Sequence, residues 1–238
     1  MKKIVIGDIV SRAGDLAVKH WPVFVVISLI TSLVSNFGVN YDFNLLTGLG
    51  QNPDPQAVSE AIREAMQFNY PMMIIGVLLS TYLGFVTYRM LYSAITTGKP
   101  YTTLGDALKV DFVQLCVFFC AEIVYGLIVG AGCLLLVLPG IWLAVRLMFV
   151  PLLIAVDGVS FGEAFSRSWK MTSGHFWSLL LLGIVAIGIA ILGLCACCVG
   201  LIFAEVIINF MMVLAFVDLR DNDQAQVGTY TSDYTEVQ

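Results

Sequence analysis

Residues 176–217 read FWSLLLLGIVAIGIAILGLCACCVGLIFAEVIINFMMVLAFV, and this stretch decides the fold. It contains 42 residues with no lysine or arginine and with a single acid, Glu205. A transmembrane helix needs about 20 mostly apolar residues, so the stretch is long enough for two spans. Gly193, Gly200 and the small residues between them predict the turn that separates these spans.

Residues 112–156 repeat this pattern, since Glu122 and Arg146 are the charged residues in the stretch. Pro139 and Gly140 predict the break between its two spans. Two further apolar stretches complete a prediction of six spans. They are expected at about residues 21–38, 70–95, 112–132, 139–156, 176–194 and 199–217.

The composition excludes several classes of protein. Of the 238 residues, 59% are hydrophobic and 12% are charged, whereas a soluble domain carries roughly 45–50% apolar and about 25% charged residues. The chain has twelve Lys and Arg residues and seventeen Asp and Glu residues. It therefore lacks the excess of basic residues that nucleic-acid-binding proteins use. The chain holds no phosphate-binding loop, nucleophile elbow or zinc-protease motif. We therefore expect no enzyme, no cofactor and no metal.

The basic residues predict the orientation, because Lys and Arg near membrane helices stay on the cytoplasmic side. With both termini inside, Arg63 is the one basic residue outside, and Arg146 lies within a span. The first twenty residues hold no long apolar run, so the first span is expected to be an uncleaved anchor. We predict a multi-pass protein of the cell (inner) membrane. Its cytoplasmic basic residues are Lys2, Lys3, Arg12, Lys19, Arg89, Lys99, Lys109, Arg167, Lys170 and Arg220.

Two segments outside the spans have patterns of their own. In the outer segment of residues 39–69, Asp54-Pro55 followed by apolar residues at helical spacing predicts an amphipathic surface helix. Residues 220–238 are polar and acidic, which predicts a disordered cytoplasmic tail. Residues 1–219 are expected to form a single transmembrane domain.

Three short segments resemble one another and predict an internal repeat: Ile6–Val10, Leu104–Leu108 and Phe161–Phe165. His20 and His175 each lie 13 residues after the glycine of their segment, and we expect both to cap helix ends. The first and third segments have apolar residues at helical spacing with cations opposite, as helices in the membrane interface do. The apolar face predicted for the third consists of Phe161, Ala164, Phe165, Ser168 and Trp169.

The expected fold is therefore all-α, with six transmembrane helices arranged as three hairpins. Each hairpin is preceded by a cytoplasmic-side amphipathic interfacial helix. The corresponding pseudo-repeats are about residues 1–95, 96–157 and 158–219.

The sequence from Leu138 to Leu180 carries a distinctive pattern. Leu138-Pro139-Gly140 is followed by Arg146 and Pro151, then by AFSRSWKMT at residues 164–172 and GHFW at residues 174–177. This resembles a family of prokaryotic membrane proteins of unknown function, related to the membrane domain joined to some glycerophosphoryl diester phosphodiesterases. Phe165 and Met171 stand where that family has leucine. The resemblance implies six spans and an uncharacterised role, and it does not imply phosphodiesterase activity.

Charged residues inside the spans are candidate functional residues, because an isolated charge in hydrocarbon is costly and usually pairs or faces a cavity. By residue count, Glu122 and Arg146 each lie about 16 Å from a span end, near the centre of a core about 30 Å thick. We predict that they pair, either as a polar substrate site or as an ion pair that fixes packing. Glu205 and Asn209 are placed to extend the pair into an intramembrane polar network.

A second set of residues is expected to face lipid at the cytoplasmic interface, where basic side chains attract anionic headgroups and aromatic ones anchor helices. The set is Arg12, Lys19, Trp21, Lys109, Arg167, Trp169, Lys170 and Trp177. The six cysteines are expected to pack mainly as small apolar residues. A disulfide between Cys133 and one of Cys195, Cys197 and Cys198 is left open.

Two main functions fit these features. The first is a non-enzymatic membrane protein that organises lipid or a partner protein, motivated by the interfacial helices. The alternative is a small-solute transporter or channel that uses Glu122, Arg146 and Glu205 as its polar site; an intramembrane lipid enzyme ranks last. The expected partners are membrane lipids, anionic ones included, and a protein partner or a second copy of the chain, but not nucleic acid.

Overall fold

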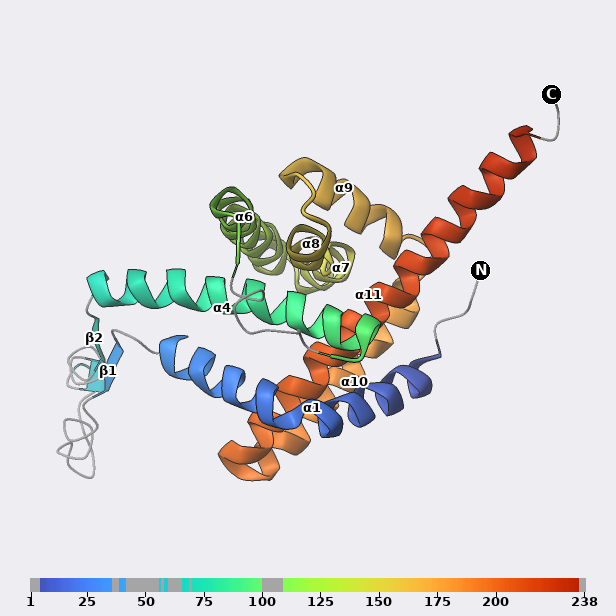
Figure 1. Cartoon of the computed structure of the whole chain (residues 1–238). Coiled ribbons are helices and arrows are strands. Elements are labelled where there is room, and N and C mark those ends of the chain that lie inside the picture. Colours follow the sequence, from blue (N-terminus) through green and yellow to red (C-terminus); the bar gives the residue numbers. More distant parts are fainter. Residues whose placement is uncertain are drawn as a thin grey trace. The chain divides into compact units, whose positions relative to one another are not determined.

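A computed structural model shows a predominantly helical chain (Figure 1). It describes residues 5–35, 39–41, 56, 58–59, 66–68, 70–99 and 109–235. Within these residues, six helical segments are long and apolar enough to cross a membrane, which confirms the predicted class of multi-pass helical membrane protein. They are Ile6–Val34, Tyr70–Thr97, Phe112–Leu135, Val137–Asp157, Phe176–Cys195 and Gly200–Arg220.

The chain forms two compact units, residues 1–28 with 85–238, and residues 29–84. The smaller unit contains two short antiparallel strands, β1 (Val39–Tyr41) and β2 (Met66–Phe68), with Val39 opposite Phe68. The sequence did not predict these strands. The surface helix expected after Asp54-Pro55 lies largely outside the described residues, as does the middle copy of the repeat at residues 104–108.

The first helix differs from the prediction, because α1 (Ile6–Ser35) is continuous. We expected an interfacial helix and then a separate span that opens at Trp21. Pro22 lies inside α1, and a proline can kink a helix without ending it. The predicted interfacial helix and the first span are therefore parts of one element.

The third and fourth spans turn at Leu136, which lies between the predicted spans of residues 112–132 and 139–156. α4 (Tyr70–Thr97) and α6 (Phe112–Leu135) begin at the expected residues. α7 (Val137–Leu147) then starts after one residue, Leu136, and packs against α6. Pro139 lies in the first turn of α7, where backbone N–H groups have no helical partner to lose. Pro139 and Gly140 are thus inside the helix and do not break it.

The fourth span is not a single regular helix. After α7 ends at Leu147, the span continues as α8 (Val150–Leu152) and the π-helix η1 (Leu153–Asp157). Pro151 accounts for the break, because it has no N–H to donate and its ring crowds the carbonyl four residues earlier. The helical ladder is interrupted at Met148 and Phe149.

α10 (Phe176–Cys195) and α11 (Cys197–Thr235) pack against each other on either side of Ala196. Gly193 and Gly200 flank this turn within the two helices. A Cβ on Gly200 would lie 2.5 Å from the Gly193 carbonyl oxygen, so the glycines permit a close approach of the helices. Cys133 and Cys195 are free thiols, and the side chains of Cys197 and Cys198 lie outside the described residues.

α11 extends well beyond the sixth span. Its helix continues to Thr235, so most of the tail that we predicted to be disordered is helical. Lengthening an existing helix costs much less than nucleating a new one, which accounts for the extension of a polar sequence from the end of a membrane span.

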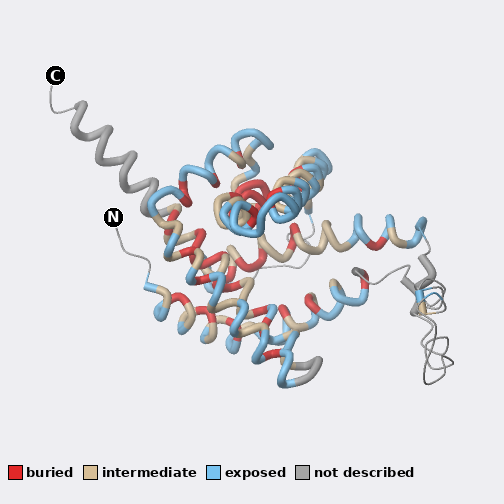
Figure 2. The backbone as a smooth tube through the Cα atoms, turned by 180° about the vertical axis from the view of Figure 1, so that it is seen from behind, coloured by how far each residue is buried: buried red, intermediate tan, exposed pale blue. Residues whose placement is uncertain are grey.

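Aromatic pairs hold the helices of the larger unit together. The pairs are Phe24–Phe210, Phe85–Phe118 and Phe149–Phe216, with ring centroids 5.0, 5.2 and 5.8 Å apart. In contrast, large apolar side chains such as Leu134 and Leu192 are 90% and 71% exposed, and Figure 2 shows long exposed stretches on the apolar helices. Such surfaces are covered by lipid in a membrane protein.

Candidate functional site

The candidate site is built around α9 (Phe161–Thr172). Glu163 lies in its first turn and Lys170 in its last, which suits the helix dipole. α9 contacts α6, α7, α8, η1 and α11. Its buried face consists of Ala164, Ser168, Met171 and Thr172. Ala164 and Ser168 of the predicted apolar face are buried, whereas Phe161 and Trp169 are 37% and 39% exposed, and the small buried side chains allow close packing.

Two hydroxyls of α9 satisfy a backbone carbonyl in the broken fourth span. Because α7 ends at Leu147, its last carbonyls lack partners within the helix. Ser168 Oγ donates to the Arg146 carbonyl oxygen at 2.9 Å, and Thr172 Oγ1 lies 3.3 Å from it while sharing its single proton with the closer Ser168 carbonyl at 2.9 Å. Ser168 and Thr172 are both 0% exposed. These bonds attach α9 to α7 at Arg146.

The double variant Ser168→Ala/Thr172→Val is expected to weaken this attachment. The Arg146 carbonyl would lose both donors, which costs about 1–3 kcal/mol for a group shielded from water. We expect a loss of unfolding free energy of that size in detergent micelles, followed by helical circular dichroism. Ser166→Ala, on the exposed face of α9, is the control; equal losses in both variants would contradict the attachment.

The guanidinium of Arg146 lies beside two indole rings that contact each other. Its Cζ is 5.4 Å from the ring centroid of Trp142 and 5.4 Å from that of Trp169. The two rings meet edge to face, with centroids 5.0 Å apart. Nη1 donates to Ser173 Oγ at 2.8 Å, and Nε is buried with no hydrogen-bond partner in the described chain. We call Trp142, Arg146, Trp169 and Ser173 the Arg146 clamp.

The predicted pair between Arg146 and Glu122 is not formed. Within the ranges that the structure describes, the ion pairs are Arg12–Asp8, Arg12–Asp218, Arg167–Glu163 and Arg220–Asp157. The clamp places the Arg146 guanidinium beside Ser173, just before α10 begins, and therefore near one end of the helices. By residue number Arg146 still lies midway along the 21-residue span Val137–Asp157, which the interruption at residues 148–149 divides.

Glu122 and Glu205 share a neighbour elsewhere in the larger unit. Tyr88 on α4 interacts electrostatically with both carboxylates and with Tyr125. α6 and α11 therefore place three polar groups within electrostatic range of Tyr88 inside their spans, apart from the Arg146 clamp. Both glutamates are exposed at the protein surface, and Asn209 on α11 is partly exposed.

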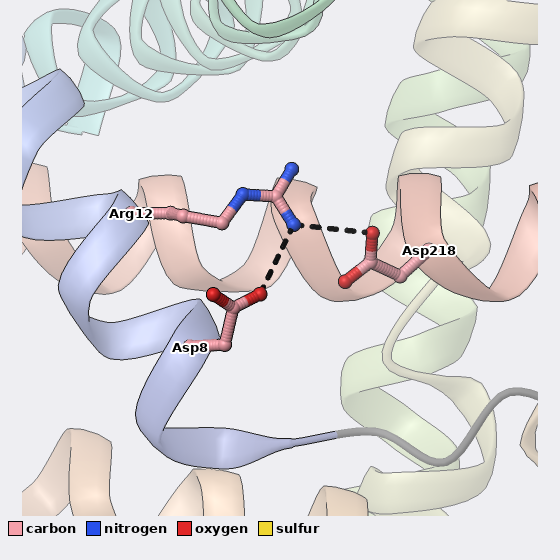
Figure 3. Close-up of polar contacts among 3 residues, drawn as sticks. All are labelled: Asp8, Arg12 and Asp218. Atoms are coloured by element: carbon pink, nitrogen blue, oxygen red, sulfur yellow. Dashed lines mark hydrogen bonds and ion pairs between the residues drawn. The ribbon is translucent and has the colours of Figure 1, made fainter.

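Arg12 lies between two acidic side chains (Figure 3). Its Nη1 is 3.6 Å from Asp8 Oδ2, one turn earlier in α1, and 3.4 Å from Asp218 Oδ1 of α11. We predicted that Arg12 faces lipid, and its side chain lies between two carboxylates while remaining partly exposed. The side chain is 43% exposed, so the two ion pairs contribute little stability individually.

A further ion pair joins α11 to the end of the fourth span. Arg220 Nη2 is 3.0 Å from Asp157 Oδ1, and Arg220 Nη1 donates to the Tyr92 hydroxyl at 2.8 Å. These contacts gather the end of α4, the end of η1 and the end of the α11 span. We call this part of the larger unit, which also holds Arg12 and Arg89, the basic end.

The remaining residues of the predicted lipid-facing set are exposed: Lys19, Trp21, Lys109, Arg167, Trp169, Lys170 and Trp177. Arg167 also forms an ion pair with Glu163 at 2.7 Å. Trp21 does not open a span, because α1 is continuous there. Its ring instead packs 6.1 Å from Phe203, near the start of the α11 span at Gly200 and away from the basic end.

Sequence reasoning singled out Arg146 and Trp169 but missed their connection. Trp142 and Arg146 are four residues apart, as are Ser168 and Thr172, and such pairs share one face of a helix. That spacing was the available signal. What it could not show is that α9 crosses α7 at this point.

The fold and these sites define an integral membrane protein with six membrane-spanning helices. A family model described as a domain of unknown function, DUF7847, matches residues 72–226. The match covers more than half of the chain, so the protein belongs to this family, and it includes the whole Arg146 clamp. The comparisons with curated proteins and with solved structures give no match.

Proposed function

We propose that the protein is a non-enzymatic membrane protein that binds anionic lipid headgroups and thereby organises lipid or a partner protein. The Arg146 clamp carries this proposal. Arg146 is held by two aromatic rings and one hydroxyl, without a carboxylate partner in the described residues. Its positive charge is therefore left for an external anion.

The chemistry of the clamp suits a lipid phosphate. A guanidinium presents paired donors that match two phosphate oxygens, and stacking on indole fixes its plane. Trp142 and Trp169 are each 39% exposed, as expected for tryptophans at the level of lipid headgroups. Exposed Lys170 lies next to Trp169 and would add an attraction of about 1 kcal/mol to an anionic surface.

The same proposal places the basic end, with both termini, on the cytoplasmic side of the cell membrane. It also treats the hairpins as three repeats. The repeat rests on the likeness of the segments that precede His20 and His175. The two histidines do not cap helices as expected, since His20 lies inside α1 and His175 makes no side-chain cap hydrogen bond at the start of α10. We also propose that the protein is related to the membrane domain joined to some prokaryotic glycerophosphoryl diester phosphodiesterases. Reporter fusions at the N-terminal and C-terminal ends of the chain test the orientation. We expect both reporters on the cytoplasmic side, and reporters on opposite sides of the membrane would refute the proposed orientation.

Lipid selection tests the proposed function. The protein would be purified from membranes that hold equal phosphatidylglycerol and phosphatidylcholine, and its retained lipid measured by native mass spectrometry. We expect phosphatidylglycerol to be enriched, and the enrichment to fall as salt is raised, because ions screen exposed charges. Equal retention of the two lipids at low salt would rule out the function.

Small-solute transport is the second candidate. It is favoured by Glu122 and Glu205, two acids inside the spans that both lie within electrostatic range of Tyr88, because acidic groups within a membrane often mark an ion or proton pathway. Uptake of cations into proteoliposomes tests it. Flux that is lost in Glu122→Gln/Glu205→Gln would support transport, and absence of flux in the unaltered protein would remove this candidate.

A further inference from the structure

A pocket of about 280 Å³ lies at the basic end, apart from the Arg146 clamp. α4 supplies most of its lining and η1 supplies the rest. The lining residues are Arg89, Tyr92, Ser93, Thr96, Thr97 and Val156. Pockets for small molecules usually measure about 300–1,000 Å³, so this one suits a ligand at the small end of that range. Five of the six lining side chains are polar, which indicates a polar ligand.

Arg89 supplies a positive charge to the pocket. Its Nη1 donates to the Lys109 carbonyl oxygen at 3.1 Å, and its Cζ lies 5.9 Å from the centre of the Phe85 ring. No carboxylate pairs with Arg89 in the parts of the chain that the structure describes. By contrast, the nearby Arg220 is balanced by Asp157 at 3.0 Å. The uncompensated cation favours an anionic ligand.

The hydroxyls of the pocket are arranged to accept hydrogen bonds. Ser93 donates its single proton to the Lys99 carbonyl at 3.0 Å, and Thr96 donates to the Tyr92 carbonyl at 2.9 Å. Thr97 donates to the Ser93 carbonyl at 2.7 Å. Each oxygen keeps acceptor lone pairs. The Tyr92 hydroxyl accepts from Arg220 at 2.8 Å, so its own proton remains available to donate.

We propose that this pocket binds a phosphate ester of a polyol. The phosphate lies on Arg89 and the Tyr92 hydroxyl, and the polyol hydroxyls donate to the oxygens of Ser93, Thr96 and Thr97. A phosphate dianion has no hydrogen-bond donors for these oxygens, and an alkyl phosphate has none on its organic part. A polyol ester has such donors in its hydroxyl groups. The ester is either a soluble molecule or the headgroup of a lipid such as phosphatidylglycerol. This site is independent of the Arg146 clamp and of the function proposed for it.

Calorimetric titration of the full chain in a neutral detergent tests the proposal with two probes, glycerol phosphate and inorganic phosphate. We expect glycerol phosphate to bind about tenfold more tightly, corresponding to one or two added neutral hydrogen bonds. Arg89→Gln should weaken both probes by about tenfold or more, and Arg89→Lys by less, because the loss of a charge-assisted bond is the larger effect. Unchanged melting temperatures would show that these variants fold.

Two further variants sharpen the test. Thr96→Val should reduce the preference for glycerol phosphate, because one of the three acceptor oxygens is lost, and leave phosphate binding unchanged. Arg146→Gln should change neither, which separates this pocket from the lipid site. If Arg89→Gln binds both probes as the unaltered protein does, or if Thr96→Val keeps the full preference, the proposal is overturned.

Competition identifies the source of the ester. Micelles doped with phosphatidylglycerol should displace glycerol phosphate if the natural ligand is a headgroup, and phosphatidylcholine should not. Persistence of glycerol phosphate binding in excess phosphatidylglycerol assigns the site to a soluble ester. If the protein binds neither the soluble ester nor phosphatidylglycerol through Arg89, the pocket has no such role.

Discussion

Gly140→Ala is expected to lower the free energy of unfolding by about 3 kcal/mol, the upper part of the range for overpacking a well-packed contact. A Cβ at this position would lie 2.6 Å from the backbone nitrogen and 2.8 Å from the Cα of Cys133. Backbone atoms cannot rotate away as a side chain can, so α6 and α7 would have to separate. Titration with sodium dodecyl sulfate in mixed micelles, followed by helical circular dichroism, would measure the loss.

Gly126→Ala is the matched control in the same helix pair. A Cβ on Gly126 meets nothing within 4 Å, and alanine is favoured over glycine inside a helix by about 1 kcal/mol. Gly126→Ala should therefore be neutral or stabilising. If both variants destabilised the protein equally, the close contact of α6 with α7 would be refuted.

Arg146→Gln is expected to weaken binding of phosphatidylglycerol by about thirtyfold. Hydrogen bonds to charged groups contribute roughly 1.5–3 kcal/mol, and about 1.4 kcal/mol corresponds to a tenfold change. Glutamine removes the charge and the paired donors but keeps a polar side chain of moderate length. The affinity would be measured by native mass spectrometry with defined amounts of added lipid.

Two variants distinguish lipid binding by the Arg146 clamp from a general attraction of the lipid to surface charge. Arg146→Lys keeps the charge but loses the guanidinium that contacts the Trp142 and Trp169 rings, so we expect an intermediate affinity. Arg167→Gln removes a cation that Glu163 already balances at 2.7 Å and should have little effect. If Arg167→Gln weakened binding as much as Arg146→Gln, general surface charge and not the clamp would attract the lipid.

The number and class of the helices could be predicted from the sequence because they depend on local composition. Apolar stretches such as residues 176–217 have few alternatives to spanning a membrane. The turns were harder to locate. Pro139 looked like a break because proline usually ends a helix, but at the third position of α7 it costs no hydrogen bond. The ends of α1 and α11 were also misplaced from the sequence, because a helix can continue past unfavourable residues such as Pro22 or the polar residues after the sixth span.

The candidate site could be predicted less completely, because it depends on contacts between distant segments. Arg146 was recognised from its charge inside an apolar stretch, but its partner was not Glu122. The break at Pro151 frees the Arg146 carbonyl, and α9 then packs where Ser168 and Thr172 can reach it. Packing geometry of this kind has no signature in periodicity alone. The pocket near Arg89 likewise depends on α4 meeting η1.

Solid-state NMR tests the central claim most directly, by measuring dipolar coupling between arginine side-chain ¹⁵N and lipid ³¹P. The protein would be labelled on arginine and placed in phosphatidylglycerol bilayers, with Arg146→Gln used to assign the signal. We predict a coupling that shows direct contact between the Arg146 guanidinium and a lipid phosphate, and its loss in the variant. A spectrum of the unaltered protein that lacks any coupling assignable to Arg146 would contradict the account.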